Sequence, residues 1–413
     1  MIDIAVIGGG AAGYYAAIQA AKMAPNLSVT IFEKGHLGLE KVRISGGGRC
    51  NVTHDALAPE FLATHYPRGS RALLGPFHHH GPKEVISFFE SHGVPLKIES
   101  DGRMFPLANT SKAIIDCFST LREQLGIRLQ AKETVKDISL GEDLVWSIKT
   151  TTQEWKAKNV LMATGSSPKM LRMLKDLGHG IEIGVPSLFT FNIKDSRIEG
   201  LAGLSTPALV QLKIPGVKPK KALAAEGPLL ITHWGLSGPA ILKLSAWGAR
   251  LLQEQAYHFK ISVNFVPSLK NQEMALEALF LLKKSVAKKT LINTVSFGLP
   301  KRLWQRLLWA VSLPTDLIWA NSTKTQLQLL AAVLVNAEFT VAGKSTFKEE
   351  FVTAGGIQLK EVSFKDLQSK KFPGLFFAGE ILNIDAITGG FNFQNAWTTG
   401  YLAAKGMTQR LAN

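Results

Sequence analysis

The chain has 413 residues, 46% of them apolar, and carries 47 basic against 32 acidic side chains, which gives a formal net charge of +15. This length and apolar content exclude a disordered chain and allow two or three domains, each with its own core. With only two cysteines, the chain has neither a disulfide framework nor a cysteine metal cluster, and no metal site is expected. No apolar stretch has the length needed to span a bilayer.

The opening residues predict a strand, a turn and a helix, followed by a second strand. Apolar runs at 2–7 and 27–33 flank an alanine-rich stretch at 11–23. The start, MIDIAVIGGG, lacks the charged region and the cleavage site of a signal peptide, so we expect a cytoplasmic protein.

The turn between the first strand and the helix has the G-x-G-x-x-G spacing of a dinucleotide-binding site. Gly8 permits a tight turn, Gly10 lets the backbone approach a pyrophosphate, and Gly13 allows the helix to lie close to the sheet. The pyrophosphate is expected at the helix N-terminus, which begins with Ala11 and Ala12.

A carboxylate at the end of the second strand strengthens this interpretation. Glu33, followed by Lys34, stands twenty positions after Gly13, where a carboxylate accepts hydrogen bonds from a ribose diol. The glycine spacing alone is a weak signal. Placed between a strand and a helix and followed by this carboxylate, it predicts a bound dinucleotide.

A triple glycine, in SGGGRCNVT at 45–53, stands directly before an arginine and a cysteine. Glycine loses more conformational freedom on folding than any other residue, so a folded chain keeps such a run where its backbone must come close to another group. We therefore predict that this loop contacts a ligand; a plain surface turn is the alternative.

The rest of the chain changes pattern several times. Residues 83–150 mix helix-like and strand-like patterns and lead into AKNVLMATG at 157–165, a buried strand that ends in a small-residue turn. Short strands such as ALVQLKI follow within 186–267, and 271–335 have helical periodicity. LFFAGEIL at 375–382 returns to a buried strand, followed by a glycine turn and a last helix.

This order predicts an α/β protein whose nucleotide-binding domain is interrupted by an insert. Strands near both ends of the chain have the continuous apolar runs typical of a buried parallel sheet. If they belong to one sheet, the middle of the chain must form an insert between two parts of the same domain. We expect a Rossmann-like, three-layer domain formed by residues 1–190 and 345–413, with a β-rich insert at 191–270 and a helical part of the insert at 271–344.

FAD fits this pattern better than a pyridine nucleotide. A pyridine nucleotide needs one such site, whereas a bound flavin needs contacts from elsewhere in the chain. Two further turns supply candidates: VLMATGS at 160–166, and the segment 374–396, in which Gly379-Glu380 ends a strand and Gly389-Gly390 precedes the last helix. The sequence has no second G-x-G-x-x-G for a nicotinamide domain.

Five motifs, in this order along the chain, resemble those of the BaiN/HI0933-type family of FAD-dependent oxidoreductases. They read LEKVRISGGGRCNVT, DGRMFP, THWGLSGPAIL, FVTAGGI and AGEILNIDAITGGFNFQNAWTTG. The resemblance spans nearly the whole chain. It implies a discontinuous FAD domain, an inserted β-barrel-like domain and a small helical domain.

The resemblance also implies which residues contact FAD. The triple-glycine loop would lie along the pyrophosphate and the flavin, with the fixed charge of Arg49 beside the phosphates. Val135 would pass the adenine, Thr164 the middle of the cofactor, and residues 390–393 the isoalloxazine ring. The implied contacts are Lys41, Ser45, Gly46, Gly47, Gly48, Arg49, Cys50, Asn51, Val135, Thr164, Gly165, Gly379, Glu380, Gly390, Phe391, Asn392 and Phe393.

Two segments depart from the family pattern. Members commonly read G-R-K before the glycine loop, where this chain has Leu39-Glu40-Lys41. After the A-T-G turn, SSPKMLRMLKDLGHG at 166–180 replaces a glycine-rich segment. Substrate access is therefore expected to differ from that of relatives.

The positive charge is concentrated in the middle of the chain. Residues 191–345 hold 19 basic and 8 acidic side chains, whereas the rest of the chain holds 28 and 24. Relatives reduce uridine in ribosomal RNA, oxidise aminoacetone or reduce unsaturated steroid acids. Such a field attracts RNA phosphates and repels the aminoacetone cation, and one steroid carboxylate does not require so broad a surplus.

We therefore expect an enzyme that reduces uridine to dihydrouridine in large-subunit ribosomal RNA, with NAD(P)H as the electron donor. A small-molecule flavin oxidoreductase and a non-enzymatic RNA-binding flavoprotein are the alternatives. Trp304 and Trp309 are candidates to stack bases, with a core role as the other interpretation. The basic residues expected to contact RNA are Lys218, Lys220, Lys221, Lys283, Lys284, Lys288, Lys289, Arg302 and Arg306.

Three residues are candidates for the chemistry itself. The Cys50 thiol, beside Arg49, is a possible proton donor, and packing beneath the cofactor is its alternative role. His233 is a second candidate donor, with a structural hydrogen bond as the alternative. Arg103, in the D-G-R motif, is expected to face the substrate or to pin a turn.

Overall fold

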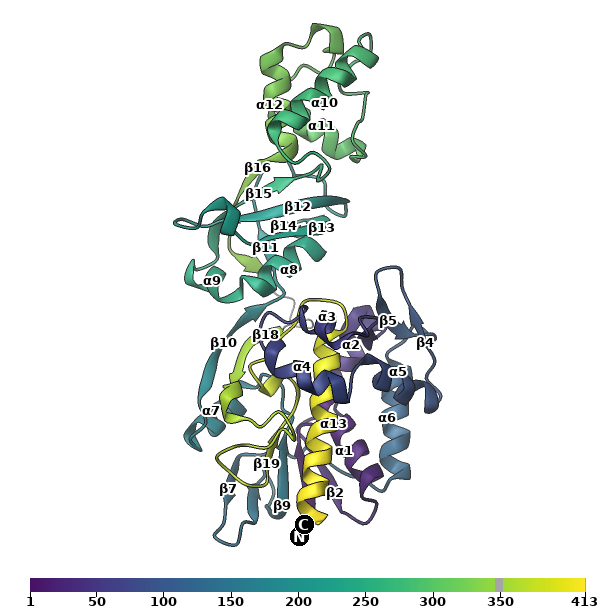
Figure 1. Ribbon diagram of the computed structural model, residues 1–413, viewed down its shortest axis with the longest axis vertical. Helices are drawn as coiled ribbons and strands as arrows, with labels where there is room; N and C mark the ends of the chain where they lie inside the picture. Colours follow the sequence, from purple (N-terminus) through teal and green to yellow (C-terminus); the bar gives the residue numbers. More distant parts are fainter. Residues whose placement is uncertain (346–351, 413) are drawn as a thin grey trace. The chain divides into compact units, whose positions relative to one another are not determined.

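The computed structural model describes residues 1–345 and 352–412, which fall into two compact units (Figure 1). Unit 1 comprises Met1–Pro186 with Lys348–Asn413, and unit 2 comprises Ser187–Phe347. The expected division placed the ends of the nucleotide-binding domain at 190 and 345. Unit 1 consists of the two ends of the chain, and unit 2 is the single continuous segment between them in the sequence.

Unit 1 is built on a sheet whose central strands are parallel. Ile4 pairs with Val29 on one side and with Asn159 on the other, and Leu375 pairs with Val160. The strands that begin at Ile2, Val29 and Leu375 are mostly buried, as is the second half of the strand that contains Asn159, as expected for a parallel sheet covered on both faces. The order is β6-β2-β1-β9-β19, from β1 (Ile2–Ile7), β2 (Val29–Glu33), β6 (Arg128–Ala131), β9 (Glu154–Met162) and β19 (Leu375–Phe377).

An antiparallel meander extends the same sheet. β8 (Trp146–Lys149) pairs with the first half of β9, and β7 (Asp137–Leu140) pairs with β8. β19 pairs only with the last residues of β9, whereas β8 pairs with its first residues. β8 and β19 therefore pair with different parts of β9 and do not overlap. The fold class is therefore confirmed as a Rossmann-type α/β domain.

Two long helices pack together in unit 1. α1 (Ala11–Met23) is rich in alanine, the best helix former, and contacts α13 (Phe391–Ala412) along its length (Figure 1). Gly400 of α13 makes this approach possible, because a Cβ there would lie 3.0 Å from the carbonyl oxygen of Ala12. The first and last helices of the chain thus share one core.

Shorter elements complete unit 1. β3, β5 and β4 form a three-stranded antiparallel sheet, and β10 pairs with β18. Across the described residues, no helix combines the length and the apolarity needed to cross a membrane. The remaining elements are α2 (Glu40–Gly48), β3 (Thr53–His54), α3 (Pro59–Ala63), α4 (Ser70–His79), α5 (Pro82–Ser91), β4 (Leu96–Ile98), β5 (Arg103–Pro106), α6 (Lys112–Gln124), α7 (Pro168–Asp176), β10 (Ile181–Ser187) and β18 (Val352–Ile357).

Unit 2 contains a closed antiparallel sheet. Its order begins with β16 and ends with β17, two strands that are separated in the chain by Gly343 alone. The Gly343 N–H donates to the Tyr257 carbonyl and its own carbonyl accepts from Asn192, so this residue joins the two edges into a barrel. The order is β16-β15-β12-β13-β14-β11-β17, from β11 (Thr190–Asn192), β12 (Ser205–Lys213), β13 (Ala224–Thr232), β14 (Gly235–Ser237), β15 (His258–Asn264), β16 (Ala337–Ala342) and β17 (Lys344–Ser345).

The helices of unit 2 share one core with this barrel. Leu330 of α12 and Leu303 of α11 are fully buried in the same cluster as Val210 of the barrel. β16 lies within the segment 271–344 that was expected to be helical, because the barrel needs a last strand to close it. The helices are α8 (Pro239–Trp247), α9 (Ala249–Glu254), α10 (Gln272–Ser285), α11 (Lys301–Ala310) and α12 (Lys324–Val335).

Candidate functional site

The three motif glycines in the turn from β1 into α1 have two roles: two of them allow backbone segments to pack closely, and the third leaves space open beside the helix. A Cβ on Gly13 would lie 2.0 Å from the Gly8 carbonyl oxygen, and one on Gly8 would lie 2.5 Å from the Ala163 carbonyl oxygen. A Cβ on Gly10 would meet nothing within 4 Å. Gly10 is also the N-cap of α1, so the free N–H groups of the first turn, at Ala11 and Ala12, lie beside open space.

Glu33 lies against the same turn. Its two carboxylate oxygens accept the backbone N–H groups of Gly9 at 2.8 Å and of Gly35 at 2.7 Å. These contacts fix the carboxylate beside the glycine turn and leave further lone pairs for a ribose hydroxyl. The adjacent Lys34 is exposed.

The triple-glycine loop breaks the helix α2. Ser45, Gly46 and Gly47 have non-helical dihedral angles, and Gly46, Gly47 and Gly48 have φ values of 57°, 67° and 82°. A Cβ on Gly47 or Gly48 would meet nothing within 4 Å. The loop is therefore a left-handed backbone segment that faces open space, as a cofactor cradle requires.

The C-terminal glycine turn packs directly on this loop. Gly390 has a φ of 89°, and a Cβ there would lie 2.5 Å from the Thr53 carbonyl oxygen. The Asn51 side-chain amide accepts from the Gly390 N–H at 3.0 Å and donates to the Thr53 carbonyl at 3.0 Å. Trp397 of α13 donates its indole N–H to the Val52 carbonyl at 2.9 Å. Two of the predicted cofactor segments are thus in contact.

The other predicted segments meet at the carboxyl ends of β1, β9 and β19. Lys41 pairs with Glu380 at 2.5 Å, and a Cβ on Gly379 would lie 3.0 Å from the Cβ of Ala12. A Cβ on Gly165 would lie 3.6 Å from Glu380. This edge is where ligands bind in open α/β sheets.

The residues gathered here fit FAD. The hydroxyl of Thr164 is buried and has no hydrogen-bond partner among the described residues. It follows β9, on the same edge as Gly10, and a buried hydroxyl without a partner is costly unless a ligand satisfies it. The Thr164 hydroxyl and the backbone N–H groups of Gly47 and Gly48 can therefore donate hydrogen bonds along an extended, phosphate-containing ligand.

The remaining predicted cofactor residues are placed around these turns. Val135 is buried just before β7. The Asn392 side chain accepts from the Ala386 N–H at 3.0 Å and donates to its carbonyl at 3.2 Å, and so holds the preceding loop. Phe391 is buried and stacks on the rings of His65 and His54, at centroid distances of 4.2 and 4.7 Å. Phe393 stacks on Trp397 at 5.6 Å.

Cys50, a predicted proton donor, is completely buried and has a φ of 61°. Burial raises the pKa of the Cys50 thiol to about 12, in spite of a hydrogen bond with Ser45. At neutral pH the side chain is therefore a thiol, which holds a proton but is neither a nucleophile nor a base. Its catalytic role stays a prediction.

Arg103 and Arg49 share one carboxylate that the sequence did not reveal. Glu99 accepts from Arg49 at 2.7 Å and from Arg103 at 3.3 Å, and Arg103 also pairs with Asp101 at 2.7 Å. The Arg49 guanidinium lies 4.0 Å from the centre of the Phe105 ring. The hairpin pattern in LKIESDGRMFP was the available signal, because it places Glu99 and Arg103 on either side of one turn.

His233 belongs to unit 2, whereas the predicted cofactor residues belong to unit 1. It is exposed in the turn between β13 and β14. His78 and His79 are exposed and His80 is buried. No group of three metal-ligating side chains occurs within 1–345 and 352–412.

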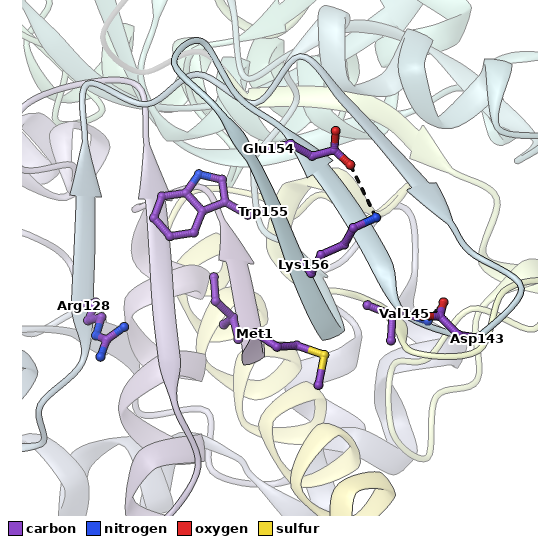
Figure 2. Close-up of a pocket in the computed structure, with 8 residues that line it drawn as sticks. Met1, Arg128, Asp143, Val145, Glu154, Trp155 and Lys156 are labelled. Carbon is purple, nitrogen blue, oxygen red and sulfur yellow. Dashed lines mark hydrogen bonds and ion pairs between the residues drawn. The ribbon is translucent and has the colours of Figure 1, made fainter.

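A cavity of about 490 Å³ lies at the opposite edge of the sheet (Figure 2). It is lined by residues at the beginnings of strands, among them Ile2, Arg128 and Trp155. Parallel α/β sheets bind cofactors at the carboxyl ends of their strands, where Gly8 and Thr164 lie. This cavity is therefore separate from the candidate cofactor site.

Comparison with known proteins agrees with this geometry. Residues 2–406 match the model of the HI0933-like protein Rossmann domain. The chain is 26% identical to a ribosomal RNA dihydrouridine synthase of Haemophilus influenzae over 98% of both chains, and 27% identical to a 3-dehydro-bile acid delta(4,6)-reductase of Clostridium scindens over 99% of this chain and 100% of that one. The fold resembles E. coli quinol fumarate reductase FrdA, with a TM-score of 0.54 at 15% identity, over 100% of this chain and 70% of that one. This chain therefore belongs to the family of HI0933-like proteins and is an FAD-dependent oxidoreductase.

Proposed function

We propose that this enzyme reduces uridine to dihydrouridine in large-subunit ribosomal RNA, with NAD(P)H as the electron source. The observation that carries the proposal is a set of exposed cations on unit 2 that have no acidic partner among residues 1–345 and 352–412. None of them forms an ion pair with another described residue. The set is Lys218, Lys220, Lys221, Lys284, Lys288, Lys289 and Arg302.

Lys213 of unit 2 is paired with the Glu338 carboxylate and contributes less. Lys283 donates to the Ser322 carbonyl at 2.5 Å, which holds the side chain without neutralising its charge. The contrast matters because a lysine that is already neutralised releases few counterions when it meets a phosphate. Three lysines of this set come just before β13, three lie at and after the end of α10, and Arg302 lies on α11, so the set offers several positions for an RNA backbone.

When bound and reduced by NAD(P)H, FAD would supply the hydride for C6 of the uracil ring, and this chain would supply the proton for C5. The Cys50 thiol is protonated at neutral pH and is the proposed donor. Arg103, held by Glu99 and Asp101, is proposed to orient the uracil carbonyl groups. The target base must be unpaired or leave its stack, at a cost of a few kcal/mol.

The test is a mass-spectrometric measurement of dihydrouridine in ribosomal RNA from a strain that lacks this gene. We expect the modification to disappear and to return with the wild-type gene. A gene carrying Lys284→Glu, Lys288→Glu and Lys289→Glu should fail to restore it, although the purified variant retains its yellow flavin. An unchanged dihydrouridine level in the deletion strain would refute the proposal.

A small-molecule reductase is the second candidate. The similarity to a bile acid reductase, which covers 99% of this chain, favours it. In that case purified enzyme would oxidise NAD(P)H in the presence of an unsaturated 3-oxo steroid acid, and the charge-reversed variant would do so at the same rate. An aminoacetone oxidase would instead form peroxide rapidly with that amine.

A further inference from the structure

Two tryptophans of α11 have opposite environments. Trp304 is fully buried and donates its indole N–H to the Leu291 carbonyl at 2.8 Å, so it belongs to the core. Trp309 is 47% exposed. The inner face of α11 is already filled by Leu303, Leu307 and Trp304, and Trp309 does not contribute to that core.

Trp309 shares the outer face of α11 with two arginines. Arg302, Arg306 and Trp309 follow one another at spacings of four and three residues, which places them in one row on a helix. The Arg306 guanidinium lies 5.3 Å from the centre of the indole ring. It therefore covers part of the ring as a cation–π partner while much of the ring stays exposed to solvent.

The two arginines are held in place by backbone carbonyls, not by carboxylates. Arg302 donates to the Gly200 carbonyl, and Arg306 donates to the Ser196 carbonyl at 3.5 Å. Neither forms an ion pair within the described residues. Both guanidinium groups therefore keep their full charge for an external anion.

Most charged residues in and around α11 are basic, although the exposed Glu199 directly precedes Gly200, whose carbonyl Arg302 contacts. The helix KRLWQRLLWA contains no acidic residue, and Lys301 at its first turn is exposed. Lys288 and Lys289 are exposed in the segment that leads to Leu291, which contacts the inner face of α11 through Trp304. An exposed aromatic ring among cations without acidic partners is the arrangement of single-stranded nucleic-acid sites.

We infer that Trp309 is a stacking site for an unpaired nucleobase, with Arg302 and Arg306 bound to the phosphates on either side of it. A base presents a π-face to the indole while its phosphates meet the guanidinium groups, so one ligand satisfies both features. A steroid acid has one anionic group and no aromatic face. The inference rests on the proposed RNA substrate and names how unit 2 would hold that RNA.

The experiment measures binding of a short fluorescein-labelled oligouridylate to the FAD-loaded protein by fluorescence anisotropy. Because a stacked base is lost, Trp309→Ala should weaken binding about tenfold, whereas Trp309→Phe, which retains an aromatic face, should bind within about threefold of wild type. Trp247→Ala is the matched control, because Trp247 is 41% exposed on α8, outside this row. It should bind as wild type does.

The salt dependence separates stacking from charge. Arg302→Ala and Arg306→Ala should each reduce the slope of log affinity against log salt by about 0.7, while Trp309→Ala should leave the slope unchanged. Trp309→Ala binding equal to that of wild type, or an equal loss in Trp309→Phe, would overturn the inference. If oligouridylate binds through Trp309 and the deletion strain keeps its dihydrouridine, the proposed function fails and the stacking site stands.

Discussion

Gly10 and Gly13 belong to the same motif, but glycine is required at the two positions for different physical reasons. Gly13 is required by the protein itself, because any side chain there would overlap the Gly8 carbonyl oxygen. A Cβ on Gly10 would meet nothing within 4 Å, and the residue has an extended backbone, with φ of −92° and ψ of −171°. An alanine at Gly10 would meet no other part of the protein, so the glycine there serves the ligand.

We therefore expect Gly13→Ala to lower the free energy of unfolding of the flavin-free protein by about 1–3 kcal/mol, the usual range for overpacking. Gly10→Ala should leave that stability within about 0.5 kcal/mol of wild type, as surface substitutions do, and should reduce the flavin content after purification. Chemical denaturation of both apoproteins and the visible absorbance of both purified proteins are the measurements. Full flavin content in Gly10→Ala would contradict this account of the turn.

At the scale of elements, local periodicity predicted the strands and helices whose pattern is regular. β1, α1 and β2 follow the expected strand, helix and second strand. The buried run at 157–165 contains most of β9, and the run at 375–382 contains β19. β16 was missed, although AEFTVA alternates buried and exposed residues, because it directly follows a helix. The break in α2 at 45–47 is the glycine run that the sequence singled out.

The candidate site was predictable only in part. The motif glycines can be recognised in the sequence because each must permit a close approach or a left-handed backbone. The side-chain pairs that join the segments cannot be recognised in this way. Lys41 and Glu380, for example, lie 339 residues apart, and no local sequence pattern predicts their contact. Glu99 was missed as a partner of Arg49 for the same reason, because 50 residues separate the two, whereas its pairing with Arg103 is local and follows from the hairpin at 96–106.

One buried ionic cluster ties two elements of unit 1 together. His179, just before β10, contacts Glu361 at 2.9 Å and Ser369 at 3.4 Å. The order Ser, His, Glu resembles a hydrolase triad. However, the Ser369 hydroxyl is buried and accepts the N–H groups of Lys371 and Phe372, so it holds a turn and is not available as a nucleophile.

This cluster predicts a loss of stability in acid. Burial favours a higher pKa for Glu361, but hydrogen bonds from Lys371, the Gly180 N–H and His179 outweigh it and lower that pKa to about 2. Burial also lowers the pKa of His179. Both groups bind protons more weakly in the folded state, so their contribution is complete above about pH 6.5 and is lost as the pH falls toward 2.

Glu361→Gln should therefore cost stability at pH 7 and flatten the decline of the urea midpoint between pH 5 and pH 3. Glu142→Gln is the control, because Glu142 is exposed in the same unit and forms no ion pair within the described residues. It should reproduce the wild-type curve. A Glu361→Gln curve parallel to that of wild type would show that this carboxylate does not control the acid response.

At the scale of the whole molecule, the chain holds two separate hydrophobic cores. The core of unit 1 is formed by both ends of the chain around α1 and α13, and the core of unit 2 joins the barrel to α10, α11 and α12. The predicted cofactor residues all belong to unit 1, and the unpaired cations belong to unit 2. Flavin binding should therefore stabilise one core directly, since a ligand that binds only the folded state raises its unfolding free energy.

This division predicts two thermal transitions that single substitutions can move separately. Leu330 of α12 and Leu174 of α7 are both fully buried, one in each core. Leu-to-Ala substitution in a core costs about 2–5 kcal/mol. Leu330→Ala should lower a calorimetric transition without lowering the temperature at which flavin fluorescence appears, whereas Leu174→Ala should lower the flavin-release temperature. If both variants shift a single transition and release flavin together, the two cores unfold as one cooperative structure, and the insert must then contribute to cofactor retention.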